Sequence, residues 1–323
     1  MSDKKPSPPR KKYRSHPRKV GAYTVLEVES DSERSTIYLA VDDEEQQIWL
    51  LALPKNVDHE YVLQFKRRME TLLHLNHIGL PEIQDNRTRK NSHAFATFHH
   101  QPLSSLSRQF HMDEDETDPL PPERALELIR KIAEVLAVMH PAGLVHTDLQ
   151  PDRIFFDQDE NPLFLDAAVP FIPSANKHEG ENITRLPYAS PEEREGKSIT
   201  ARSNIYSLGV ILYQLLAGHQ PRLPVSEWDI FEYKALPREV PLEDARAGLT
   251  TETYDLVRNC LWQKEWSRYE TMEQLIAAIE IAGAAEEIGP PPPPDFFTKN
   301  KTWFLVGVPV LLFLLVLLYF LLL

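Results

Sequence analysis

The sequence predicts an α+β fold with two lobes, a β-rich small lobe followed by a helical large lobe, together with one C-terminal transmembrane helix. Three observations predict it: short β-rich segments gather in the first hundred residues, amphipathic segments dominate from about residue 120, and residues 303–323 carry no charge. The chain has 323 residues, 42% of them hydrophobic, so it can bury a sizeable core and is not disordered throughout.

The small lobe is expected to be an antiparallel meander with one helix. The segments Tyr23–Val28, Thr36–Val41 and Ile48–Leu53 are β-rich and separated by polar turns. Apolar side chains then recur at helical spacing over Glu60–Leu75, and Ala94–Phe98 again has the pattern of a strand. We expect this lobe to occupy about residues 20–100.

The large lobe, about residues 101–285, is expected to be helical. Its first helix is marked by Pro121 and Pro122, because proline is favoured in the first turn of a helix. The predicted helices are Glu123–Met139, Ser203–Leu216, Thr251–Trp262 and Thr271–Ala282.

The two ends of the chain differ from the folded part in composition. Residues 1–19 hold eight Lys or Arg and one Asp, which predicts a disordered basic arm of net charge +7. The rest of the chain carries −20, so nucleic acid is not an expected partner. The single Cys260 excludes an internal disulfide and a thiolate metal cluster, which favours a reducing compartment.

The C-terminal segment has the length and composition of a membrane anchor. Residues 303–323 would span about 31 Å as a helix, which matches the hydrocarbon thickness of a bilayer. Residues 286–302 form a linker with the polyproline run Pro290–Pro294, and Lys299 and Lys301 precede the apolar segment. We therefore expect a single-pass tail anchor with the domain at 20–285 on the cytoplasmic side.

Five short motifs follow one another in the folded region. They are HTDLQP at 146–151, LFLDAA at 163–168, YASPE at 188–192, SNIYSLG at 203–209, and the late Arg268-Tyr269. In this order and spacing the chain resembles the protein kinase family, especially bacterial-type Ser/Thr kinases, over nearly all of residues 20–283. The resemblance implies the two-lobed kinase fold, and it implies a structural ion pair between Glu192 and Arg268.

The resemblance also locates the positions that hold a nucleotide in kinases, and each carries an unexpected residue. The three glycine positions of the phosphate-covering loop fall on Ser30, Ser32 and Ser35, although glycine lets the backbone approach phosphates closely. The strand lysine position falls on Ala52, and its helical glutamate partner on Arg68. The acidic residues Glu29, Asp31 and Glu33 surround the three serines and would in addition repel phosphate.

The catalytic loop is altered in a similar way. His146 and Asp148 are retained, and Arg153 stands at the position of the Mg²⁺-binding asparagine. Asp166 remains a candidate for one Mg²⁺, but Ala167 and Ala168 follow it in place of Phe-Gly. A guanidinium cannot ligate Mg²⁺. We therefore interpret Asp148 as a vestigial base with a structural role, and His146 as structural.

Two functions are compatible with these residues. The first is a membrane-anchored pseudokinase that acts in signalling as a scaffold or allosteric partner of other proteins, an active kinase among them, and needs no cofactor. The alternative is a divergent active Ser/Thr kinase that uses ATP and Mg²⁺ and repositions Lys55, Arg153 or residues of a partner to hold ATP. The bacterial resemblance suggests the inner membrane as the location.

Overall fold

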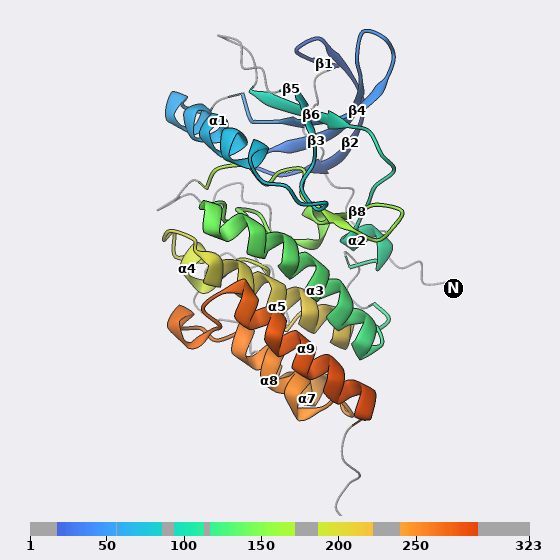
Figure 1. Cartoon of the computed structure of the whole chain (residues 1–323), viewed down its shortest axis with the longest axis vertical. Coiled ribbons are helices and arrows are strands. Elements are labelled where there is room, and N and C mark those ends of the chain that lie inside the picture. Colours follow the sequence, from blue (N-terminus) through green and yellow to red (C-terminus); the bar gives the residue numbers. More distant parts are fainter. Residues whose placement is uncertain are drawn as a thin grey trace, which may run out of the picture.

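The computed structural model describes residues 18–55, 57–85, 94–112, 117–171, 187–221 and 240–289. A lobe built around a sheet lies on a larger lobe of helices (Figure 1), which confirms the α+β fold with two lobes. The basic arm up to residue 17, most of the acidic stretch at 113–118 and the predicted linker and anchor from residue 290 lie outside the described residues. Within those ranges, no helix combines the length and apolar character needed to cross a membrane.

The small lobe is an antiparallel sheet of six strands in the order β1-β2-β3-β4-β6-β5. The strands are β1 (Lys19–Val20), β2 (Tyr23–Asp31), β3 (Thr36–Val41), β4 (Gln47–Ala52), β5 (Ile83–Asp85) and β6 (Phe95–His99). The four predicted strands are present with ends shifted by up to three residues. The short strands β1 and β5 were not predicted, because segments of two or three residues have no measurable periodicity.

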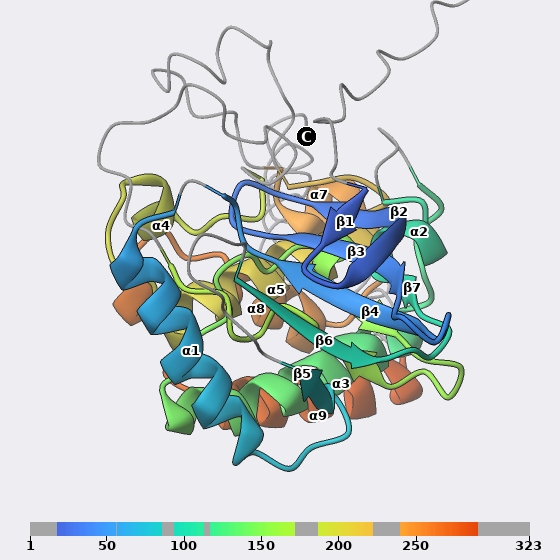
Figure 2. The same ribbon diagram turned by 90° about the horizontal axis from the view of Figure 1, so that it is seen from above.

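The helix α1 (His59–Leu73) covers one face of this sheet (Figure 2). Asp58 caps its N-terminus, since the carboxylate accepts a hydrogen bond of 2.7 Å from the Tyr61 N–H. Phe65, Met69 and Leu72 lie one turn apart on the buried side of the helix. This placement brings the middle of α1, and with it Arg68, against the large lobe.

The two faces of the sheet are packed separately, because successive side chains of a strand point to opposite faces. Leu51 pairs with Ile37 across β3 and β4, and both belong to the main core that also contains the buried side of α1. Leu50 pairs with Tyr38, and both belong to a second cluster that includes Ala52. Ala52 therefore lies on the face opposite to α1.

The large lobe lies beneath the sheet, and its longest helices run side by side in a similar direction (Figure 1). Its helices are α2 (Leu106–Gln109), α3 (Pro122–Met139), α4 (Pro191–Arg194), α5 (Ala201–Ala217), α7 (Leu242–Ala245), α8 (Thr251–Cys260) and α9 (Met272–Ile288). Every residue of α5 from Ser203 to Leu216 is buried, so α5 is the central helix of this lobe. The four predicted long helices are all present.

Short elements connect these helices and lie at the junction with the sheet. The 3-10 helices are η1 (His140–Ala142), η2 (Pro151–Arg153) and η4 (Glu265–Ser267), and the small sheet is β7 (Ser104–Ser105), β8 (Phe155–Phe156) and β9 (Pro162–Leu163). The loop between η1 and η2 carries residues of the HTDLQP motif, and the residues after β9 belong to the LFLDAA motif. Both face the tip of the β2–β3 hairpin.

Candidate functional site between the lobes

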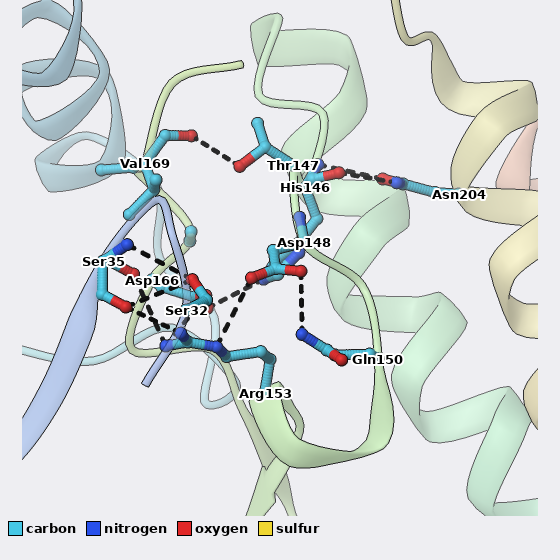
Figure 3. Close-up of polar contacts among 12 residues, drawn as sticks. Ser32, Ser35, His146, Thr147, Asp148, Gln150, Arg153, Asp166, Val169 and Asn204 are labelled. Carbon is cyan, nitrogen blue, oxygen red and sulfur yellow. Dashed lines mark hydrogen bonds and ion pairs between the residues drawn. The ribbon is translucent and has the colours of Figure 1, made fainter. Parts of the chain in front are cut away.

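The site lies where the hairpin β2–β3 meets the loop before η2 and the segment after β9 (Figure 3). His146, Asp148, Arg153 and Asp166 come together there, and each is at most 2% exposed. Four of the residues singled out in the sequence are thus gathered in one buried polar cluster.

His146 is held in one orientation by two hydrogen bonds. Its Nδ1 accepts from the Asp148 N–H at 3.3 Å, so in the neutral ring the proton lies on Nε2, which donates to Asp166 Oδ1 at 2.9 Å. The Asn204 side chain of α5 pairs with the backbone N–H and C=O of His146 at 3.0 and 2.8 Å. This arrangement agrees with the structural role expected for His146, and it holds Asp166 Oδ1 against the His146 ring.

Arg153 fills the space between the two aspartates. Its side chain is fully buried, with Nε 3.6 Å from Asp148 Oδ2 and Nη1 3.9 Å from Asp166 Oδ2. Its Nη2 donates a hydrogen bond of 2.8 Å to the carbonyl of Ser35 at the hairpin tip. The guanidinium therefore contacts both retained carboxylates and the loop that would cover phosphates.

Asp148 has a second polar neighbour. The Gln150 side chain donates from Nε2 to Asp148 Oδ1 at 2.9 Å. A general base must have an oxygen within reach of the proton that it abstracts. With the side chains of Gln150 and Arg153 on its two oxygens, the buried Asp148 is built into the loop, which favours the structural interpretation.

Arg68 crosses from α1 to the segment that follows Asp166. It donates to the carbonyls of Val145, Ala167 and Ala168 at 2.8, 3.1 and 3.2 Å. Burial lowers the pKa of Arg68 to about 10, so the group stays charged at neutral pH. Arginine at this position thus ties the helix to the large lobe through backbone carbonyls, an interaction that sequence reasoning did not find.

The three serines at the glycine positions, Ser30, Ser32 and Ser35, are buried in the hairpin tip. Ser32 Oγ donates to the carbonyl of Ser35 at 3.2 Å and accepts from the Ser35 N–H at 3.3 Å. These bonds close the turn on itself. The backbone N–H of Ser35, which a phosphate could otherwise use, therefore has an internal partner in the Ser32 side chain. The three serine side chains also occupy space that glycine would leave open.

Two further ion pairs connect the hairpin to the large lobe. Arg34 Nη2 lies 3.3 Å from Glu193 Oε1 of α4, and Arg108 of α2 lies 2.9 Å from Glu29. Burial raises the pKa of Glu29, and Arg108 opposes this shift. The acidic residues of the hairpin, which the sequence suggested would repel phosphate, here include one that anchors the hairpin.

Ala52, which the motif count places at the lysine position, lies on the face of the sheet opposite to α1. Ala52 points away from α1, whereas Leu51 and Leu53 lie on the α1 side with the main core. A count along the sequence cannot show which face a strand residue takes, because the register of the hairpin decides it. The residues facing α1 are leucines, and Lys55 is exposed after Pro54.

Trp49 occupies the start of β4 on the same face. Its indole Nε1 donates a hydrogen bond of 3.0 Å to the carbonyl of Gln101, in the segment that connects the two lobes. Its ring lies 5.5 Å from that of His100, measured between centroids. This buried side chain therefore joins β4 to the connection between the lobes, and no sequence signal distinguished it from an ordinary strand tryptophan.

A divalent cation does not fit the residues present. Asp166 presents one oxygen to His146 and the other to Arg153, so a metal ion there would face a buried guanidinium. Across the ranges that the structure describes, no group of three or more His, Cys, Asp or Glu could hold a metal ion. We accordingly derive no metal-assisted step from this site.

The ion pair expected between Glu192 and Arg268 is present in the large lobe. Arg268 donates from Nη1 and Nη2 to the two oxygens of Glu192 at 2.8 and 2.9 Å, and Ser203 Oγ donates to the same carboxylate at 2.7 Å. Burial alone would raise the pKa of Glu192, but the hydrogen bonds from Arg268 and Ser203 outweigh it and hold the pKa at about 2. The pair fastens α4 to the segment before α9.

This lowered pKa predicts a loss of stability in acid. Because the carboxyl group has its ordinary pKa of about 4.5 when the chain is unfolded, its contribution is complete above pH 4.5 and is lost as the pH falls toward 2. The free energy of unfolding, measured by urea titration at each pH, should decrease across this window. A Glu192→Gln variant should show a shallower decrease, and parallel curves would contradict the assignment.

Comparison with known proteins identifies the family. The model of the protein kinase domain matches residues 33–278. The Ser/Thr protein kinase PrkC of Bacillus subtilis is 25% identical over 274 residues, covering 83% of this chain and 41% of that protein. The Ser/Thr protein kinase PknB of Mycolicibacterium smegmatis is 26% identical over 230 residues, covering 68% of this chain and 36% of that protein. The chain thus spans about two fifths of the length of these relatives.

A solved structure shows the same fold. The kinase domain of PknI from Mycobacterium tuberculosis superposes with a TM-score of 0.61 at 20% identity, covering 82% of this chain and 97% of that domain. The likeness in structure concerns the fold, and the match to the domain model begins between β2 and β3 and extends over the catalytic loop and the Arg268 segment. The chain therefore belongs to the protein kinase family.

Proposed function

We propose that this protein is a pseudokinase that acts by binding other proteins and not by phosphoryl transfer. The observation that carries the proposal is the position of Arg153, whose buried guanidinium lies between Asp148 and Asp166. In an active kinase, the carboxylate at the position of Asp148 accepts the proton of the acceptor hydroxyl, and the one at the position of Asp166 binds Mg²⁺. In this chain both already face an internal cation.

The magnitude of the losses supports the same conclusion. Removing one preorganised electrostatic group commonly reduces a rate by 10²–10³-fold, about 3–4 kcal/mol. The loop glycines, the strand lysine, its glutamate partner and the metal-binding asparagine are all replaced here. Such effects are not additive. Even so, losses of this number would leave little transfer above the uncatalysed rate.

The alternative is an active Ser/Thr kinase that transfers phosphate from ATP to protein hydroxyls. The names of the relatives favour it, since PrkC and PknB are both called Ser/Thr protein kinases. For this chain it would require Arg153 to leave the aspartates and the hairpin tip to open. The retained Asp148 and Asp166 would then act as base and Mg²⁺ ligand.

The place of action is part of the proposal. The uncharged segment 303–323 would anchor the chain in a membrane, with the kinase-like domain on the cytoplasmic side. The bacterial sources of the relatives favour the inner membrane. Its partners there would be proteins of a signalling complex, an active kinase among them.

The test is nucleotide binding and transfer by the full-length chain in detergent. A ligand present at 100 times its Kd stabilises a protein by about 2.7 kcal/mol, which shifts the melting temperature by several degrees. We expect 5 mM Mg-ATP to shift it by less than about 1 °C, with no phosphate transfer above that of Asp148→Asn. An active Ser/Thr kinase assayed in parallel is the positive control. A Mg²⁺-dependent shift with transfer that Asp148→Asn abolishes would establish the alternative.

A further inference from the structure

We propose that Arg153 is a built-in replacement for the metal ion, a cation within the chain that neutralises Asp148 and Asp166 and holds the β2–β3 hairpin closed without Mg²⁺ or nucleotide. The inference rests on the proposed function, because it explains how a kinase fold can keep its closed form when it does not bind nucleotide. It concerns the stability and conformation of the domain.

The first argument is electrostatic. Asp148 and Asp166 are both 2% exposed and both lie within 4 Å of the Arg153 guanidinium. Two neighbouring carboxylates in a buried site repel each other, and an unpaired buried charge is costly, so such a site needs a compensating cation. The side chain of Arg153, which is fully buried, supplies that cation from within the chain.

The second argument is the shape of the contact. The guanidinium reaches Asp148 with Nε at 3.6 Å and Asp166 with Nη1 at 3.9 Å, so it bridges the two groups and does not pair with one of them (Figure 3). Arg153 stands at the sequence position of the Mg²⁺-binding asparagine, so its positive charge lies beside Asp166, the carboxylate that a kinase would use for Mg²⁺. The planar fork of arginine can fill it because its donors point in several directions.

The third argument is the connection to the hairpin. Arg153 Nη2 donates to the carbonyl of Ser35 at 2.8 Å, a contact between residues 118 positions apart in the chain. The pairs Arg34–Glu193 and Arg108–Glu29 hold the same hairpin from two other directions. The hairpin is therefore tied to the large lobe by three arginines, and only the tie through Arg153 also neutralises the aspartates.

The experiment measures thermal unfolding of the full-length chain in detergent without any nucleotide. In the wild type, 10 mM MgCl₂ should change the melting temperature no more than NaCl of equal ionic strength. Arg153→Met should lower it by on the order of 10 °C in EDTA, because two buried carboxylates lose their cation. MgCl₂ should recover several degrees of this loss.

Arg258→Met is the control, since Arg258 is 55% exposed and faces exposed acids. The melting temperature of Arg258→Met should stay close to that of the wild type and should not respond to Mg²⁺.

A second set of variants keeps the test decisive if Arg153→Met does not fold. Adding Asp148→Asn and Asp166→Asn removes the repulsion, so the triple variant should fold and melt above Arg153→Met, with no response to Mg²⁺. In that variant, hydrogen exchange of the backbone amides at 32–36 should still be about tenfold faster than in the wild type, because the tie to Ser35 is lost.

Three results would overturn the inference. They are a Mg²⁺-specific stabilisation of the wild type, an absence of recovery in the triple variant, and unchanged exchange at 32–36 when Arg153 is replaced. No nucleotide enters these measurements. Phosphoryl transfer by the wild type would therefore overturn the proposed function without changing any of these readouts, and the two failures can be told apart.

Discussion

Replacement of Arg268 by methionine is expected to lower the free energy of unfolding by about 3–5 kcal/mol, the cost of leaving one partner of a buried ion pair without the other. The Arg268 side chain is 0% exposed and that of Glu192 is 8% exposed. Arg268 also donates to the carbonyls of Trp262 and Gln263 at 2.7 and 3.2 Å. Its loss therefore leaves the buried Glu192 carboxylate without its cation and the carbonyls of Trp262 and Gln263 without this donor.

Urea unfolding of the full-length chain, followed by circular dichroism, measures this effect. Arg130→Met is the control, because Arg130 forms a partly exposed pair with Glu134 one turn along α3 and its replacement should cost about 0.3–0.5 kcal/mol. The double variant Glu192→Met with Arg268→Met should recover part of the loss, since it leaves no unpaired charge. Equal effects of the buried and the exposed replacement would contradict the structural role of the pair.

Replacement of Gly218 by alanine is expected to cost roughly 2–4 kcal/mol, through backbone strain and a collision. Gly218 follows the last residue of α5 with φ of +78°, a conformation that disfavours side chains. A Cβ atom there would lie 2.2 Å from the carbonyl oxygen of Thr117. The Thr117 N–H donates to the carbonyl of Gly218 at 2.8 Å, so the two backbones cannot separate without breaking this bond.

Gly143 offers a matched control. Its φ of +77° is nearly the same, but a Cβ atom there would meet nothing within 4 Å. Gly143→Ala should therefore cost only the strain of the backbone, about 1 kcal/mol. The difference between the two variants in urea unfolding isolates the collision with Thr117. A difference below about 0.5 kcal/mol would show that the segment at Thr117 yields easily.

Much of the secondary structure follows from local patterns in the sequence. The helix α3 was predicted over Glu123–Met139 and begins one residue earlier, because two prolines and a run of apolar spacing specify it locally. The helix α9 was predicted to end at Ala282 but continues to Ile288. Its last turns are held by Glu286, which accepts hydrogen bonds from Thr250 and Thr253 of a different helix. Nothing within α9 itself indicates this contact.

At the candidate site, too, local sequence patterns predict some features, and contacts between distant residues decide the others. Counting within motifs identified His146, Asp148, Arg153 and Asp166 as the residues to examine, since each stands at a fixed distance from its neighbours in the chain. The count could not show that Ala52 lies on the face opposite to α1, because the face that a strand residue takes depends on the register of its hairpin. It also could not find the contacts of Arg68 with the carbonyls of the opposite lobe.

The sequence by itself determined the order of the elements and the identity of the residues at the interlobe site, because helical spacing and motif spacing are encoded over a few neighbouring residues. Only the tertiary structure decided that Arg153 bridges two aspartates and holds Ser35, 118 positions away. The physical reason is that the place of a buried charge depends on the partners that packing brings to it, and these partners come from segments that are distant in the chain.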